Sequence, residues 1–294
     1  MRVARTKMEL REALAPMRRQ DGLLGLVPTM GYLHEGHLSL LRAARDRCQV
    51  VVMSLFVNPT QFGPNEDLGT YPRAEGRDLR LAEAEGVDLV YAPDVDEVYP
   101  PGFATAVEVG GGLTDVLDGD AQQRGPEHFR GVTTVVAKLL AAVSPDVLFM
   151  GQKDAQQVVV IRRMVADLDF PTELVVLPTV REPDGLALSS RNAYLSGAER
   201  DRALALSRAL HAVAAAAEGG ERSVETALEA GRSELRAAGV EPEYLEARDA
   251  RDLAPAESFN GRPVLVAVAA RVGGARLIDN VLIGESRTDR EGAG

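Results

Sequence analysis

Two histidines, His34 and His37, stand three residues apart in the segment PTMGYLHEGH, residues 28–37. A short apolar run ends at Pro28 and a stretch with helical periodicity follows, so the pair falls where a buried strand passes into a helix. Free backbone N–H groups and the helix dipole at such a terminus attract anions. The two imidazoles could donate hydrogen bonds to phosphate oxygens and stabilise the charge of a departing pyrophosphate. Alternatively, they cap the turn or are satisfied in the core.

A zinc site is a weaker interpretation of the same pair, because HEGH lacks the HExxH spacing and only His128 and His211 remain as distant imidazoles. The usual phosphate motifs are absent from the sequence. It has no Gly-Lys dipeptide for a P-loop and no GxGxxG after the first predicted strand. A nucleotide would have to be bound in another way.

A second polar segment, FVNPTQF at residues 56–62, leaves a predicted strand. It places Asn58 and Gln61 near the carboxyl end of that strand, where doubly wound sheets bind ligands. Their amides suit the recognition of hydroxyl and carboxylate groups without adding a competing charge. A polar turn around Pro59 and Gly63 is the alternative.

A third segment, GQKDAQQ at residues 151–157, also follows a strand and opens a helix. Lys153 could contact phosphate and Asp154 a ribose hydroxyl, or the two could form a solvated helix start. Lys7, Lys138 and Lys153 are the only lysines among 33 basic residues. A lysine in a chain that elsewhere uses arginine favours a specific role.

The segment LSSRN, residues 188–192, combines two hydroxyls with an arginine. Ser189, Ser190 and Arg191 are suited to binding phosphate oxygens, since the guanidinium stays charged at any relevant pH. The alternative is a helix cap in an interdomain loop.

Composition limits the classes of function. The formal net charge of -11 argues against a general nucleic-acid surface, and the apolar runs are too short for the ~20 residues of a membrane span. The N-terminal 20 residues carry charges throughout, unlike a secretory signal, and predict an amphipathic helix. The single Cys48, within a predicted helix, excludes an internal disulfide. We expect a soluble, cytoplasmic protein that binds neither nucleic acid nor membrane.

The order of elements predicts two domains. Strands are expected at 22–27, 50–57, 87–92, 147–150 and 173–177, with helices at 38–47, 77–85 and 154–167. Strands that alternate with helices indicate the α/β class, here a doubly wound, Rossmann-like parallel sheet in residues 1–180. Residues 181–290 predict a smaller α+β domain, with helices at 199–218 and 224–238 and strands at 243–248, 263–271 and 276–283.

Together these segments resemble the pantothenate synthetases, or pantoate–β-alanine ligases, within the wider HxGH nucleotidyltransferase superfamily. The blocks that carry the resemblance appear in family order: PTMGYLHEGH, FVNPTQF, YPR (71–73), HFRGV (128–132), GQKDAQQ, PTVRE (178–182), LSSRN and LIDN (277–280). HxGH alone would indicate only nucleotidyl transfer. FVNPTQF, KDxQQ and SSRN make the assignment specific.

The resemblance implies an ATP-dependent ligase that forms a pantoyl adenylate, releases pyrophosphate, and then joins pantoate to β-alanine with release of AMP. ATP would contact Met30, Gly31, Tyr32, Leu33, His34, Glu35, Gly36, His37, Gly151, Gln152, Lys153, Asp154, Val180, Leu188, Ser189, Ser190 and Arg191. His37, as general acid, with His34, Lys153 and Arg191, would be catalytic. Gln61, Gln157 and Asn58 would hold the substrates.

Other implications concern the metal, the assembly and the second domain. Mg²⁺ would accompany ATP, with Asp78 as a candidate ligand although Arg77 thins the acidic cluster that the family often carries there. Gln152 and Ala155 stand where the family usually has Glu and an aromatic residue, and Leu188 replaces a frequent Met. We expect a homodimer, a second domain that acts as a lid, and Arg191 on a mobile segment.

Two rival functions stay open. Another HxGH nucleotidyltransferase would transfer a nucleotide to a phosphate acceptor and stop there. A nucleotide-binding regulatory module would have no turnover.

Overall fold

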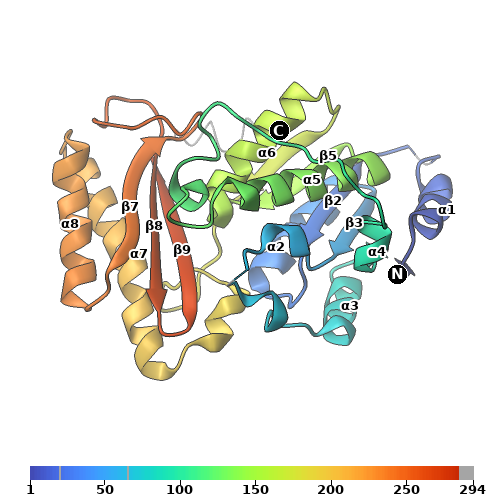
Figure 1. Ribbon diagram of the computed structural model, residues 1–294, viewed down its shortest axis with the longest axis horizontal. Coiled ribbons are helices and arrows are strands. Elements are labelled where there is room, and N and C mark those ends of the chain that lie inside the picture. Colours follow the sequence, from blue (N-terminus) through green and yellow to red (C-terminus); the bar gives the residue numbers. More distant parts are fainter. Residues whose placement is uncertain (20, 65, 285–294) are drawn as a thin grey trace.

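Two β-sheets organise the computed structural model, which describes residues 1–19, 21–64 and 66–284 (Figure 1). The larger sheet has six strands in the order β1-β4-β3-β2-β5-β6, and all its pairings are parallel. These strands are β1 (Arg2–Ala4), β2 (Leu24–Thr29), β3 (Val50–Leu55), β4 (Leu89–Tyr91), β5 (Val147–Gly151) and β6 (Glu173–Leu177). The strand order reverses direction between β2 and β5.

Helices cover both faces of this sheet. They are α1 (Lys7–Met17), α2 (Glu35–Arg47), α3 (Glu75–Ala84), α4 (Val95–Val98), α5 (Pro126–Val143) and α6 (Ala155–Asp167). Because strand side chains alternate, Leu26 and Val52 pack into the core that contains α1, α5 and α6, while Val27, Val51 and Met53 pack with α2 and α3. The near-continuous apolar runs of β2 and β3 are the pattern of strands buried on both faces.

The smaller sheet is antiparallel and contains β7 (Pro242–Asp249), β8 (Val264–Val272) and β9 (Ala275–Ile283). Val264, Val266 and Val268 of β8 face the core that holds α7 (Gly197–Glu218) and α8 (Val224–Ala237). Leu265 and Ala267 belong instead to the core of the large sheet. Figure 1 shows the small sheet with α7 and α8 at one end of the molecule and the large sheet at the other.

The predicted fold class is confirmed, while three local expectations are corrected. The N-terminal 20 residues begin with strand β1 before α1, because residues 2–4 pair with β4. Helix α5 was not anticipated, although Gly125 and Pro126 are a typical start signal. Cys48 follows the last turn of α2 rather than lying within it, and is buried.

The predicted division at residues 180 and 181 lies between the two sheets, and residues 285–290 of the second predicted domain lie outside the described residues. Among the described helices, none is both long and apolar enough to cross a membrane.

Helix α5 makes an unusually close approach to the short 3₁₀ helix η1 (Pro59–Gln61). A Cβ added at Gly131 would lie 2.2 Å from the carbonyl oxygen of Thr60. The carbonyl of Gly131 also accepts a hydrogen bond from Asn58 Nδ2 at 3.1 Å. Only glycine fits at position 131, because any side chain there would collide with the backbone of Thr60. The 3₁₀ helix that carries Gln61 therefore packs directly against α5.

We predict that Gly131→Ala lowers the free energy of unfolding by ~1–3 kcal/mol, because the added methyl group must displace backbone atoms. Urea denaturation measures the change. Gly197→Ala is the matched control, because Gly197 starts α7 and a Cβ there meets nothing within 4 Å. Equal stability of the two variants would contradict the close approach.

Candidate active site

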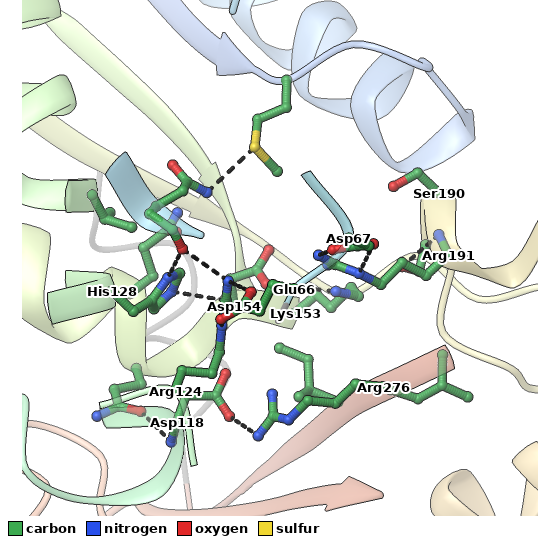
Figure 2. Close-up of a pocket in the computed structure, with 18 of the residues that line it drawn as sticks. Glu66, Asp67, Asp118, Arg124, His128, Lys153, Asp154, Ser190, Arg191 and Arg276 are labelled. Carbon is green, nitrogen blue, oxygen red and sulfur yellow. Dashed lines mark hydrogen bonds and ion pairs between the residues drawn. The ribbon is translucent and has the colours of Figure 1, made fainter. Parts of the chain in front are cut away.

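A cavity of about 940 Å³ opens at the carboxyl ends of β2 and β5, where the strand order reverses (Figure 2). This is the position at which doubly wound sheets bind ligands, and the volume suits a nucleotide and a small acid together. Most side chains predicted for the site line it: Met30, His34, His37, Asn58, Gln61, Lys153, Asp154, Gln157, Leu188, Ser189, Ser190 and Arg191. Gly31, Tyr32, Leu33, Glu35, Gly36, Asp78, Gly151, Gln152 and Val180 do not line it.

The two histidines lie together at the start of α2. Their ring centroids are 4.1 Å apart, and His37 Nδ1 accepts the backbone N–H of His34 at 3.3 Å. A neutral His37 therefore carries its proton on Nε2, which leaves an N–H to donate to a ligand. The Nδ1 atom of His34 is buried without a hydrogen-bond partner among the described residues.

Both imidazoles are held neutral in the absence of a ligand. Burial, followed by the nearby positive charge of Lys153, lowers the pKa of His34 to about 4. Burial, followed by His34 and then Lys153, lowers the pKa of His37 to about 3. At neutral pH the pair consists of hydrogen-bond donors and acceptors, and only an incoming polyanion would favour the charged forms.

Gly36 makes room for this arrangement. A Cβ at Gly36 would lie 3.0 Å from Cε1 and 3.1 Å from Nδ1 of His34. A larger residue between the histidines would push on the ring of His34. The glycine of HxGH thus has a steric reason in this chain.

Asp78 holds the turn that precedes the histidines. Its side chain is 1% exposed, and its two oxygens accept the backbone N–H groups of Tyr32 and Leu33, both at 2.8 Å. Gly31 and Tyr32 have positive φ angles of 87° and 51°, so the carboxylate fills a nest of N–H groups. These N–H groups and Asp78 hydrogen-bond to each other, and Asp78 lies outside the cavity lining, so its role as a metal ligand stays a prediction.

Asn58 is hydrogen-bonded to other groups of the protein through both polar atoms of its side chain. Its Nδ2 donates to Gln61 Oε1 at 3.1 Å and to the carbonyl of Gly131, while its Oδ1 accepts from the hydroxyls of Thr60 and Tyr99. The structure thus shows an orienting role for Asn58, which also lines the cavity, and its direct contact with substrate stays a prediction. Asn58 fixes the amide of Gln61, whose Nε2 points to Met30 Sδ at 3.3 Å.

A group that the sequence did not reveal supports Gln61 from behind. His128 Nδ1 donates to the carbonyl of Gln61 at 2.7 Å, and its Nε2 accepts from Arg124 at 2.9 Å. Arg124 in turn forms a two-point pair with Glu66. Figure 2 shows His128, Arg124 and Glu66 among the side chains that line the cavity. His128 belongs to HFRGV, but Gln61, which it supports, lies 67 residues upstream.

Burial, and then the charge of Arg124, lowers the pKa of His128 to about 4. The contact with Arg124 requires an unprotonated Nε2. The two contacts together therefore stabilise the neutral tautomer of His128 that carries its proton on Nδ1.

Lys153 and Arg191 both line the cavity, but their positive charges are paired with carboxylates to different extents. Arg191 donates to both oxygens of Asp67, at 2.9 and 2.8 Å. Lys153 lies 3.5 Å from Asp154, so its ammonium is less tightly paired. A bound phosphate would have to share Arg191 with Asp67 but could take Lys153 with less competition.

The two serines of LSSRN are hydrogen-bonded to their surroundings. Ser189 Oγ accepts from the backbone N–H of Arg191 at 3.2 Å, and Ser190 Oγ lies 3.1 Å from the hydroxyl of Tyr71. The segment is thereby held against residues 67–71, from which Asp67 also comes.

No group of three or more His, Cys, Asp or Glu side chains in the described part of the chain is placed to hold a metal ion. The zinc interpretation of His34 and His37 has no third ligand there.

We predict that the free energy of unfolding falls as pH drops from 6.5 towards about 5. The folded pKa values of His34, His37 and His128 lie below the ordinary value, so in this window the unfolded chain binds more protons than the folded one. His128, 7% exposed, contributes a slope of up to ~1.4 kcal/mol per pH unit. Urea denaturation at several pH values between about 5 and 6.5 measures the slope of the unfolding free energy against pH. His128→Asn should reduce this slope by the contribution of His128. Ring-proton NMR midpoints near 6.5 for all three histidines would contradict the prediction.

Comparison with known proteins agrees with this geometry. Residues 2–282 match the family described as pantoate-beta-alanine ligase. The pantothenate synthetase of Moorella thermoacetica is 54% identical over 284 residues, covering 94% of this chain and 99% of that protein. The Thermus thermophilus pantothenate synthetase structure is 49% identical with a TM-score of 0.89, and covers 96% of this chain and 99% of its own.

A more distant structure contains ligands. The pantoate-beta-alanine ligase of Francisella tularensis, complexed with beta-gamma ATP and beta-alanine, is 32% identical with a TM-score of 0.78 and covers 97% of this chain and 99% of its own. Fold, cavity and similarity along nearly the whole length agree, and the chain belongs to the pantoate-beta-alanine ligase family.

Proposed function

We propose that this chain is an AMP-forming ligase that joins pantoate to β-alanine through a bound pantoyl adenylate. The observation that carries the proposal is the meeting of His34, His37 and Lys153 with Gln61 and Gln157 around one cavity. The cavity thus combines cationic and N–H donors with neutral amides. That combination suits a polyphosphate together with a hydroxy acid.

In the first half-reaction, a carboxylate oxygen of pantoate attacks the α-phosphorus of ATP, and the bond to the β-phosphate oxygen breaks to release pyrophosphate. Gln61 and Gln157 would hold the nucleophile. The Nε2–H of His37 and the ammonium of Lys153 would stabilise charge on the transferring and leaving oxygens. Positioning and charge stabilisation therefore supply most of the catalysis.

In the second half-reaction, the unprotonated amine of β-alanine attacks the carbonyl carbon of the adenylate. The bond from that carbon to the AMP oxygen breaks, and the amine loses a proton as the amide forms. A covalent acyl-enzyme is not needed. Cys48 is buried away from the cavity lining, and Ser189 and Ser190 are hydrogen-bonded to neighbours other than a base.

Mg²⁺ fits this site mainly through the nucleotide. Asp78 is satisfied by two backbone N–H groups, and the cavity carboxylates Glu66 and Asp67 are paired with arginines. Asp154, less tightly paired, is the carboxylate best placed to assist. Phosphate oxygens and water would supply most of the Mg²⁺ ligands, as is common for this ion. When bound, Mg²⁺ would neutralise part of the phosphate charge.

We predict that labelled pyrophosphate enters ATP when pantoate and Mg²⁺ are present and β-alanine is omitted, because the adenylate forms before the amine is needed. His37→Ala should lower this exchange by at least ~10²-fold while leaving the fold intact, since it removes a donor aimed at developing charge. Mass analysis after addition of β-alanine should find pantothenate and AMP.

The rival functions give different results in the same assay. Exchange that requires β-alanine, or ADP as product, would overturn the adenylate mechanism. A nucleotidyltransferase acting on a phosphate acceptor would make no amide, and a regulatory module would have no turnover for His37→Ala to reduce.

The remaining expectations are proposals about the whole molecule. We retain the two-domain division at residues 180 and 181, a cytoplasmic location suited to a chain with one cysteine, and a homodimer joined through the first domain. The dimer rests on the family resemblance. We predict twice the chain mass of 31.5 kDa by light scattering at micromolar concentration, and a monomer there would refute it.

A further inference from the structure

Asn280 reaches from the small sheet to the start of α6. It lies on β9, is 5% exposed, and its Nδ2 donates to the carbonyl oxygens of Gln152 at 3.0 Å and of Lys153 at 2.9 Å. Those carbonyls belong to the 3₁₀ helix η4 (Gln152–Asp154), which follows β5. One buried amide on β9 thus holds the backbone of Lys153, whose side chain lines the cavity.

The two carbonyls also decide which way the amide of Asn280 points. Both can only accept, so the NH₂ group must face them and Oδ1 must face the other way. Oδ1 meets the side chain of Gln152, whose Nε2 donates to it at 3.1 Å. In this chain, glutamine at position 152 supplies the donor that Oδ1 of Asn280 meets.

The neighbour of Asn280 strengthens the attachment. Asp279, 4% exposed, accepts from Arg181 through both oxygens, at 2.6 and 2.9 Å. It also accepts the backbone N–H of Asn280 at 2.8 Å. The strand that presents Asn280 is thereby fixed, so η4 is held against a rigid support.

We propose that Asn280, together with Gln152, is a positioning residue that sets the place of the Lys153 ammonium in the cavity. The inference rests on the proposed function, in which Lys153 faces the phosphates. A donor placed for the transition state loses much of its effect when shifted by about 1 Å, so the backbone clamp matters to catalysis. Asn280 also lines the cavity, and the second domain then contributes to the reaction by holding the backbone of η4 in place.

A double-mutant cycle with Lys153 tests the proposal, with pyrophosphate exchange as the readout. We expect Lys153→Ala to lower the exchange rate by ~10²-fold and Asn280→Ala by ~10-fold, with KM values for ATP and pantoate within about 3-fold. In the Lys153→Ala background, Asn280→Ala should cost less than about 2-fold, because the group it positions is gone. Equal fold-losses in both backgrounds would overturn the proposal.

Tyr244→Phe is the matched control for the cycle. It removes a different hydrogen bond of the small sheet, from the Tyr244 hydroxyl of β7 to Asp118 Oδ1 in the 3₁₀ helix η3 (Leu117–Gly119) at 2.7 Å. Its effect, whatever its size, should be the same with and without Lys153. Absence of exchange in the wild-type enzyme would contradict the proposed function rather than the positioning role.

Changes at Gln152 test the amide orientation and do not depend on the folding of Asn280→Ala. Gln152→Met removes the donor, whereas Gln152→Glu also adds a facing acceptor, so the glutamate variant should lose several-fold more exchange activity. The difference in exchange activity between Gln152→Glu and Gln152→Met should disappear in the Asn280→Ala background, since Oδ1 of Asn280 is then absent. If it persists there, the glutamate acts directly on Lys153 and the proposed orientation is wrong.

Discussion

The reversal of strand order between β2 and β5 is the constraint on which the rest of the site depends. At this point the segments that leave the two strands diverge to opposite sides, so a crevice forms at their carboxyl ends. One segment carries His34 and His37, and the other carries Lys153. Residues more than a hundred positions apart meet because the sheet is parallel and doubly wound. The apolar runs of the central strands therefore determine where the phosphate-binding groups can gather.

Charge inside the crevice is balanced before any ligand arrives. Arg124 and Arg191 are paired with Glu66 and Asp67, and the histidines are neutral at pH 7. This arrangement avoids the repulsion that unpaired buried cations would create. Lys153, 3.5 Å from Asp154, is the less tightly paired cation of the cavity.

The sequence predicted the large sheet, the helices and strands that form the smaller sheet's core, and many residues that line the cavity, because these follow from periodicity and from short motifs after strands. It did not predict β1, whose three residues are too few for a pattern. It also assigned Asp78 to a metal and Asn58 to a substrate, since the types suit those roles. Their partners within the protein, Leu33 for Asp78 and Gly131 for Asn58, lie 45 and 73 positions away. Hydrogen bonds across such distances depend on tertiary packing, which local patterns do not encode.

Packing between the sheets also bears on how water is excluded from an acyl adenylate. Leu265 and Ala267 of β8 are 1% and 6% exposed within the core of the large sheet, so swinging the whole second domain away would expose them and break the clamp of Asn280. Exposing Leu265 would cost ~1.5–3 kcal/mol, and exposing Ala267 would cost less. The small sheet is therefore held against the large one by apolar burial as well as by the polar contacts of Asn280.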